Sequence, residues 1–220
     1  MKPAAFLFDL DGTLVDTEAV WARAMAAWIR EEGGEADDRE ILSFVVGHSW
    51  LDIDVMLHER YRVLGRISPA EDAVRLRAIY RSLAADPRSM VIESSAEFLR
   101  RAARLAPCAV VSGSPHDDVV AALRVAGVDS SVRLVLGAGE YDAGKPSPSG
   151  YLKAAALLGV EPRYCVVVED SAVGVASGVA AGMRVIALAR PSVIIPQRYG
   201  GETWRVGDLA EFDLTKEFGE

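Results

Sequence analysis

Two carboxylates stand two residues apart near the start of the chain, directly after a short apolar run. The run Ala4–Asp9 ends at Asp9, and Asp11 and Gly12 follow it in the segment FLFDLDGTLVDTE. Four to eight apolar residues that end at turn residues are typical of a buried strand in a parallel sheet. Residues i and i+2 of a strand face the same side, so we expect both carboxylates to converge on one point.

A close pair of carboxylates needs a compensating charge. The two groups repel each other, which raises the pKa of one of them unless a cation neutralises the pair. A hard, oxygen-liganded ion such as Mg²⁺ would keep Asp9 and Asp11 ionised together. The alternative is helix capping, because Asp, Gly and Thr are common between a strand and a helix. The segment alone leaves both interpretations open.

A Ser-Gly turn follows a second apolar run. Ser112 offers a hydroxyl group and Gly113 an unobstructed backbone N–H, while Ser114 and Pro115 have the types expected for an N-cap and a first helical residue. A helix N-terminus beside such a turn is suited to binding phosphate. Capping explains Ser114 and Pro115 but leaves Ser112 and Gly113 without a role.

Two further strand ends carry charge. Lys145 lies in the stiff segment GKPSP, where its ammonium group could neutralise a phosphate and the crowded carboxylates; the alternative is a solvated loop lysine. Glu169 and Asp170 close the apolar run that begins at Cys165, and two acids there are costly unless something binds them. A metal ion is the functional interpretation, and capping of the following helix by Asp170 is the structural one.

Alternating strands and helices must position these side chains. Five apolar runs and a weaker sixth at Thr203–Val206 alternate with helical patterns, which indicates an α/β fold with a parallel sheet and right-handed crossovers. Ligands of such sheets bind beyond the carboxyl ends of the strands, where all of the residues above stand. The stronger runs are Ala4–Asp9, Cys108–Ser112, Leu134–Gly139, Cys165–Asp170 and Arg184–Ala189, and the helical patterns between the later runs are Asp117–Ala126, Ser149–Leu158 and Ala172–Ala181.

The first two runs are too far apart for one crossover. Residues 17–86 are helical in pattern throughout, and we expect them to form a cap domain inserted after the first strand, with residues 1–16 and 87–220 forming the core. Asp16 then marks the passage from core to cap. The candidate cap helices are Glu18–Glu31, Arg39–Val45, Leu51–Tyr61 and Pro69–Leu83.

Composition excludes several classes of protein. With 24 Lys and Arg against 32 Asp and Glu, the net charge of −8 argues against binding nucleic acid or an anionic membrane. No signal peptide or membrane helix is evident. Cys108 and Cys165 open apolar runs, so we expect buried free thiols and a cytoplasmic location. There is no CxxC or His/Cys cluster that would predict zinc.

Four motifs in order resemble the haloacid dehalogenase-like hydrolase superfamily. They are DLDGT with Asp9 and Asp11, Ser112, Lys145 in GKPSPSGY, and Glu169 with Asp170 in VVVEDSAVGVASGVAAGM. The resemblance covers essentially the whole chain and implies a Rossmann-like core. The VDTE segment and the helical insertion are similar to the subgroup with a C1-type cap, which includes phosphoglycolate phosphatases, sugar-phosphate phosphatases and β-phosphoglucomutases.

The resemblance also implies roles for these residues. Asp9 would attack phosphorus, and Asp11 would act as general acid and then as general base. Ser112, Gly113 and Lys145 would hold the phosphoryl oxygens. The implied Mg²⁺ ligands are Asp9, the Asp11 carbonyl, Asp170 and, directly or through a water molecule, Glu169. We therefore expect a Mg²⁺-dependent phosphatase acting on a small phosphate monoester such as a sugar phosphate, as a monomer or weak homodimer.

Three rival activities share this fold. Dehalogenases in the superfamily need neither Mg²⁺ nor an acid two residues after the nucleophile, so Asp11 and the Glu169-Asp170 pair argue against that activity. β-Phosphoglucomutases typically carry a His near Trp21 and an Arg near Trp50, and the tryptophans argue against a mutase. A non-enzymatic phosphate-binding regulatory module is less consistent with an intact Asp9 and Asp11.

The expected cap also contains candidate substrate contacts. The loop from Gly47 through His48 to Trp50 would face the substrate, with Trp50 stacking on a sugar and His48 bonding a hydroxyl group. The alternative for Trp21 and Trp50 is packing inside the cap.

Overall fold

The chain folds into two compact units. The computed structural model describes residues 1–45, 50–65, 68–83, 87–189 and 202–219. One unit, the sheet unit, comprises Met1–Val15 and Val91–Glu220, and the other, the helical unit, is Asp16–Met90. The cap boundaries expected from the sequence were 17 and 86, so the helical unit begins one residue earlier and ends four residues later than that expectation.

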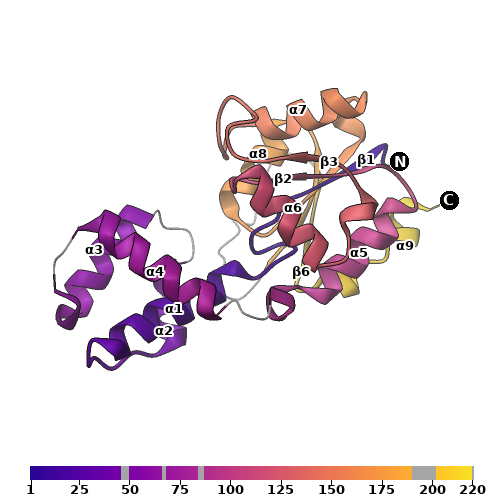
Figure 1. Ribbon diagram of the computed structural model, residues 1–220. Coiled ribbons are helices and arrows are strands. Elements are labelled where there is room, and N and C mark those ends of the chain that lie inside the picture. The colour runs from indigo at the N-terminus through magenta and orange to yellow at the C-terminus, as the bar shows by residue number, and fades with distance from the viewer. Residues whose placement is uncertain (46–49, 66–67, 84–86, 190–201, 220) are drawn as a thin grey trace. The chain divides into compact units, whose positions relative to one another are not determined.

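A six-stranded parallel sheet forms the centre of the sheet unit, and it confirms the predicted Rossmann-like α/β fold (Figure 1). The strand order is β3-β2-β1-β4-β5-β6, and every neighbouring pair is parallel. The first strand is therefore central, with β2 on one side and β4 on the other. The strands are β1 (Ala5–Phe8), β2 (Cys108–Val111), β3 (Val132–Leu136), β4 (Cys165–Glu169), β5 (Arg184–Leu188) and β6 (Thr203–Val206).

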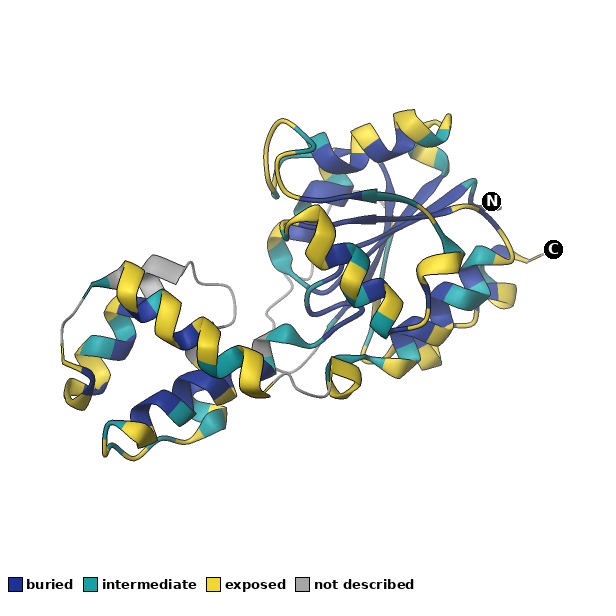
Figure 2. Ribbon diagram, in the orientation of Figure 1, coloured by how far each residue is buried: buried dark blue, intermediate teal, exposed yellow. Residues whose placement is uncertain are grey.

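Helices cover both faces of this sheet, which explains why its central strands are apolar apart from Glu169 at the end of β4. In β1, Leu7 packs in the cluster that includes Tyr151 of α7, whereas Phe6 and Phe8 pack in the cluster on the other face, which includes Phe98 of α5. Figure 2 shows the central strands buried along their whole length. The helices of this unit are α5 (Glu93–Ala103), α6 (His116–Val125), α7 (Ser149–Leu158), α8 (Ala172–Ala180) and α9 (Leu214–Phe218).

The helical unit has an apolar core of its own. Trp28, Ile29, Ile41, Leu57 and Leu76 are its largest fully buried hydrophobic side chains apart from a methionine. Helical spacing of apolar residues brings them to the inner faces of the four helices. These helices are α1 (Thr17–Glu31), α2 (Asp38–Val45), α3 (Trp50–Arg60) and α4 (Pro69–Leu83).

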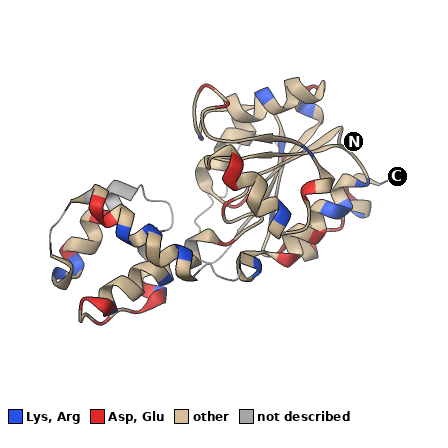
Figure 3. Ribbon diagram, in the orientation of Figure 1, with Lys and Arg blue, Asp and Glu red and all other residues tan. Residues whose placement is uncertain are grey.

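Charged side chains of both signs occur on helices of both units (Figure 3). Both cysteines, Cys108 and Cys165, are buried and free, as the sequence predicted. No helix among the described residues is long and apolar enough to cross a membrane.

Candidate active site

The turn after β1 places the first two candidate residues. β1 ends at Phe8, and the backbone then folds back so that the Leu14 N–H donates to the Leu10 carbonyl at 2.8 Å. Gly12 adopts a φ of +84°, a conformation that L residues other than glycine rarely tolerate. Asp9 and Asp11 both lie just beyond the end of β1, and the Asp9 N–H still donates to the Val168 carbonyl of β4 at 3.0 Å.

Asp9 lies among charged side chains from the end of β4 and from the loop before α7. Its side chain is 9% exposed and forms an ion pair through Oδ1 with the Lys145 ammonium group. Burial raises the pKa of Asp9 well above its usual value; Lys145 opposes this rise, and Glu169 and Asp170 add to it. The side chains beyond β1 and β4 thus meet in space, as the rule for parallel sheets predicts.

Lys145 is shared by two carboxylates. Besides Asp9, its Nζ atom contacts Glu169 Oε1 at 2.5 Å, and its side chain is only 15% exposed. Burial alone would lower the pKa of Lys145, but the Asp9 and Glu169 carboxylates more than offset it and raise that pKa well above its usual value. Lys145 is therefore a buried cation, and the alternative of a solvated loop lysine is wrong.

Glu169 is a fully buried carboxylate with a complete set of donors. The Tyr151 hydroxyl donates to its Oε1 at 2.8 Å, and the Ser171 hydroxyl donates to its Oε2 at 3.0 Å. The backbone N–H groups of Asp170 and Ser171 also donate to Oε2, each at 3.2 Å. Ser171 rather than Asp170 is the N-cap of α8, with its hydroxyl accepting from the Gly174 N–H, so the capping alternative for Asp170 is wrong.

Three carboxylates in this group are close enough to share one ion. Asp9, Glu169 and Asp170 each offer an oxygen atom, and these atoms lie within 4.8 Å of one another. A Cβ atom on Gly12 would stand 2.0 Å from Asp170 Oδ2, so glycine is what admits this carboxylate. All donors are oxygen atoms, and one lysine does not balance three acids. This donor set fits a hard divalent cation.

Asp11 makes contacts of a different kind. Its Oδ2 atom accepts from the Ser112 hydroxyl at 3.1 Å and from the Ser114 hydroxyl at 2.8 Å. Its carboxylate is not part of the three-acid group among the described residues. Ser114 does not cap α6, which begins at His116 after Pro115 with no side-chain cap; this N-cap prediction is wrong because the Ser114 hydroxyl serves Asp11 instead.

The segment that carries Lys145 is held by contacts along its length. The Ser177 hydroxyl donates to the Ser147 carbonyl at 2.7 Å, which ties the loop to α8. The Tyr141 hydroxyl donates to the Ser112 carbonyl at 2.9 Å and so joins the same segment to the end of β2. Gly113 is exposed beside these groups.

The candidate contacts in the helical unit are placed only in part. Gly47 and His48 lie outside the described residues, and Trp50 begins α3 with a side chain that also lies outside them. The Trp21 ring stacks on Tyr80, with centroids 4.1 Å apart and planes at 22°. Trp21 therefore packs within its own unit, as the alternative interpretation held.

Sequence reasoning missed several members of the site. Tyr151 and Ser171 hold Glu169, Thr13 donates to Asp170 Oδ1 at 3.3 Å, and Ser114 holds Asp11. Ser171 carried a signal, because a serine directly before an apolar helix is a typical N-cap. Tyr151 carried none, since an aromatic residue in an apolar helix is ordinarily a core residue.

The chain matches one protein-family model and many known proteins. The model described as haloacid dehalogenase-like hydrolase matches residues 3–182. Hexitol phosphatase A of Escherichia coli K12 is 34% identical over 194 residues, which cover 87% of this chain and 86% of that protein. The 6-phosphogluconate phosphatase of the same strain is 29% identical over 185 residues, covering 82% and 80% respectively.

A solved structure agrees with these relatives. The crystal structure of a HAD family hydrolase from Deinococcus radiodurans R1, with bound phosphate and sodium, has a TM-score of 0.72 to this chain. It is 29% identical, and the match covers 92% of this chain and 91% of that one.

Proposed function

Because the chain belongs to the haloacid dehalogenase-like hydrolase family, we propose that it is a Mg²⁺-dependent phosphatase that hydrolyses the phosphate monoester of a small sugar or sugar alcohol. The observation that carries this proposal is the meeting of Asp9, Lys145, Glu169 and Asp170 at one end of the sheet, beside Asp11 and its two serine hydroxyls.

Asp9 is the proposed nucleophile. Its carboxylate attacks phosphorus, the bond from phosphorus to the ester oxygen breaks, and an aspartyl-phosphate forms. Water then attacks the phosphorus, and inorganic phosphate and the free Asp9 carboxylate result. The ion pair with Lys145 favours the ionised carboxylate that the first step requires.

Asp11 is the proposed general acid and base. In the first step it gives its proton to the leaving alkoxide, and in the second step it takes a proton from the attacking water. The hydroxyl groups of Ser112 and Ser114 hold one of its oxygen atoms, which fixes the carboxyl group in direction. Removal of such a group typically costs about 10²–10⁴ in rate.

The remaining residues would bind the phosphoryl group and the cation. Lys145, the Ser112 hydroxyl and the exposed backbone of Gly113 supply positive charge and donors for its oxygen atoms. Asp9, Glu169 and Asp170, with the Asp11 carbonyl, would hold Mg²⁺, which supplies electrostatic stabilisation of the phosphoryl oxygens when bound. The bound phosphate in the similar D. radiodurans hydrolase supports an anion site on this fold.

The names of the relatives guide the choice of substrate. Hexitol phosphatase A and 6-phosphogluconate phosphatase are both named for phosphate esters of six-carbon polyols or sugar acids. A mutase is less consistent with Trp21, which packs on Tyr80 and offers no acid or base. We place the reaction in the cytoplasm, because both buried thiols are free.

The nucleophile assignment is tested with Asp9→Asn, which keeps the size of the side chain. Release of inorganic phosphate from a generic aryl phosphate and from a panel of hexitol and sugar phosphates should fall about a thousandfold or more. The control is Asp117→Asn, an exposed residue in the first turn of α6. If Asp9→Asn retains activity while folded, or if a chelator leaves wild-type turnover unchanged, the proposal is wrong.

A further inference from the structure

Three ionisable side chains meet inside the helical unit, apart from the candidate active site. Asp54 and His58 are four residues apart on α3 and so share one face of that helix. Asp72 comes from the first turn of α4. His58 Nε2 lies 2.9 Å from Asp72 Oδ2 and 3.7 Å from Asp54 Oδ1, and the three potential ligand atoms lie within 4.8 Å of one another.

These side chains are almost fully buried. The exposed fractions are 8% for Asp54, 8% for His58 and 2% for Asp72. Among the described residues, one imidazole faces two buried carboxylates. Buried carboxylates are costly unless they are paired or bind a metal ion, and an ion between these three side chains would stabilise them.

Asp72 provides a second, independent indication of a ligand. Its Oδ2 atom contacts His58, whereas its Oδ1 atom is buried and has no hydrogen-bond partner among the described residues. Buried carboxylate oxygens almost always have a partner. A metal ion bound between α3 and α4 would supply the missing partner of Asp72 Oδ1.

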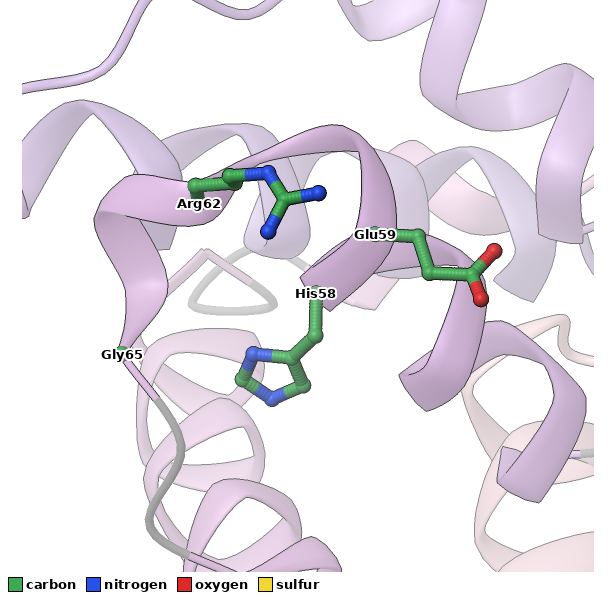
Figure 4. Close-up of a pocket in the computed structure, with 4 residues that line it drawn as sticks. All are labelled: His58, Glu59, Arg62 and Gly65. Carbon is green, nitrogen blue, oxygen red and sulfur yellow. The ribbon is translucent and has the colours of Figure 1, made fainter.

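The imidazole of His58 lies against a second aromatic ring and beside a pocket. The Trp28 and His58 rings pack edge to face, with centroids 6.0 Å apart and planes at 87°. This contact restricts the imidazole on one side. A pocket of about 460 Å³ lies beside the imidazole, lined by His58, Glu59, Arg62 and Gly65 (Figure 4). The pocket gives access to water, which would complete the coordination of a metal held by three side chains.

We propose that Asp54, His58 and Asp72 form a binding site for a divalent transition-metal ion of the Zn²⁺ type, which links α3 to α4. An imidazole nitrogen with two carboxylates suits Zn²⁺, Co²⁺ or Mn²⁺, whereas the candidate active site offers only oxygen atoms and suits Mg²⁺. The site was invisible in the sequence, because it contains no cysteine and Asp72 stands fourteen residues beyond His58.

The test is Zn²⁺ binding to the full-length protein in a large excess of Mg²⁺, which occupies oxygen-only sites. After desalting into buffer with Mg²⁺, elemental analysis should find about one Zn²⁺ per chain. His58→Gln and Asp72→Asn should each weaken Zn²⁺ binding at least about tenfold. The control is His116→Gln, because His116 contacts Glu140 on the surface, and this variant should bind like the wild type.

Two results of the binding experiment overturn the proposal. One is that the wild type retains no stoichiometric Zn²⁺, and the other is that His58→Gln and Asp72→Asn bind as tightly as His116→Gln. The Zn²⁺ content of the wild type tests the proposal even if a variant fails to fold. X-ray absorption of the Zn²⁺-loaded protein should show one imidazole and otherwise oxygen ligands, and a spectrum without imidazole contradicts the site.

Discussion

At the scale of single residues, the candidate active site depends on how Glu169 is held. Glu169 contacts Lys145, which in turn contacts Asp9. A shift of Glu169 would therefore move Lys145 and change its contact with Asp9, the proposed nucleophile. The Tyr151 hydroxyl is the side-chain donor to the same oxygen atom that Lys145 contacts. Burial raises the pKa of Tyr151 well above its usual value, so the phenol keeps its proton and remains a donor.

Tyr151→Phe tests this arrangement. The substitution keeps the aromatic ring of residue 151, whose centroid lies 5.3 Å from the Lys145 ammonium group. Only the hydrogen bond to Glu169 is lost. We expect the Mg²⁺ concentration for half-maximal activity to rise roughly tenfold, as is typical when a partner of a metal ligand is removed. Tyr164→Phe, a tyrosine that stacks with Arg163 outside the site, is the control. An unchanged Mg²⁺ titration curve for Tyr151→Phe would contradict the role.

At the scale of elements, the turn after β1 tolerates little change at Gly12. Gly12 needs a left-handed backbone and also lies against Asp170, so its conformation and the position of a proposed metal ligand are coupled. Gly33, which follows α1, has the same φ of +84° but no atom within 4 Å of where a Cβ would stand. Substituting each glycine by alanine therefore distinguishes the free-energy cost of backbone strain, which both positions share, from the cost of the clash with Asp170, which only Gly12 has.

We therefore predict different outcomes for Gly12→Ala and Gly33→Ala. Gly33→Ala should lose about 1–2 kcal/mol of stability with its turnover unchanged. Gly12→Ala should carry the same strain, displace Asp170 and lower turnover about a hundredfold or more at a fixed Mg²⁺ concentration. Activity assays with chemical denaturation of both variants give the comparison. Equal activity of the two variants would mean that the contact with Asp170 has no part in the reaction.

The elements of the sheet unit were largely predictable from the sequence. Strands β1 to β5 each overlap one of the stronger apolar runs, and α7 spans Ser149–Leu158 as its pattern predicted. Helix α5 was missed, because its polar first turn, Glu93 to Ser95, hides an inner face that contains Phe98 and Leu99. The predicted runs end one residue beyond β1, β2, β4 and β5 and three residues beyond β3, and β3 begins two residues before its predicted start.

The sequence predicted which strand ends meet at the candidate site but not which atoms are in contact there. The rule for parallel sheets brings the ends of β1, β2 and β4 together, but it does not say which oxygen atom meets which donor. The two acids after β1 were expected to converge, yet Asp9 contacts Lys145 whereas Asp11 contacts Ser112 and Ser114. Those choices depend on the turn at Gly12 and on side-chain packing across distant segments.

At the scale of the whole molecule, each unit has its own apolar core. Leu57 is fully buried in the helical unit, and Leu123 is 1% exposed in the sheet unit. Because the two cores share no members among the described residues, we expect damage to one core to loosen its own unit first.

Leu57→Ala and Leu123→Ala test this independence. Each should cost about 2–5 kcal/mol locally, the usual range for a buried leucine. Amide hydrogen exchange followed by mass spectrometry should show faster exchange within Asp16–Met90 for Leu57→Ala and within the sheet unit for Leu123→Ala. Uniform acceleration over both units in either variant would show instead that the molecule opens as one body.

The central place of β1 has a consequence during synthesis on the ribosome. Phe6 pairs with Cys108 on one side and with Val166 on the other, so the first strand to be made waits for both of its neighbours. The helical unit, Asp16–Met90, is complete before either neighbour emerges and can fold in the meantime. The apolar strand beside Asp9 stays uncovered during that interval, when nascent chains are most exposed to chaperones and to aggregation. A truncated chain that ends before β4 therefore carries Asp9 but neither Glu169 nor Asp170.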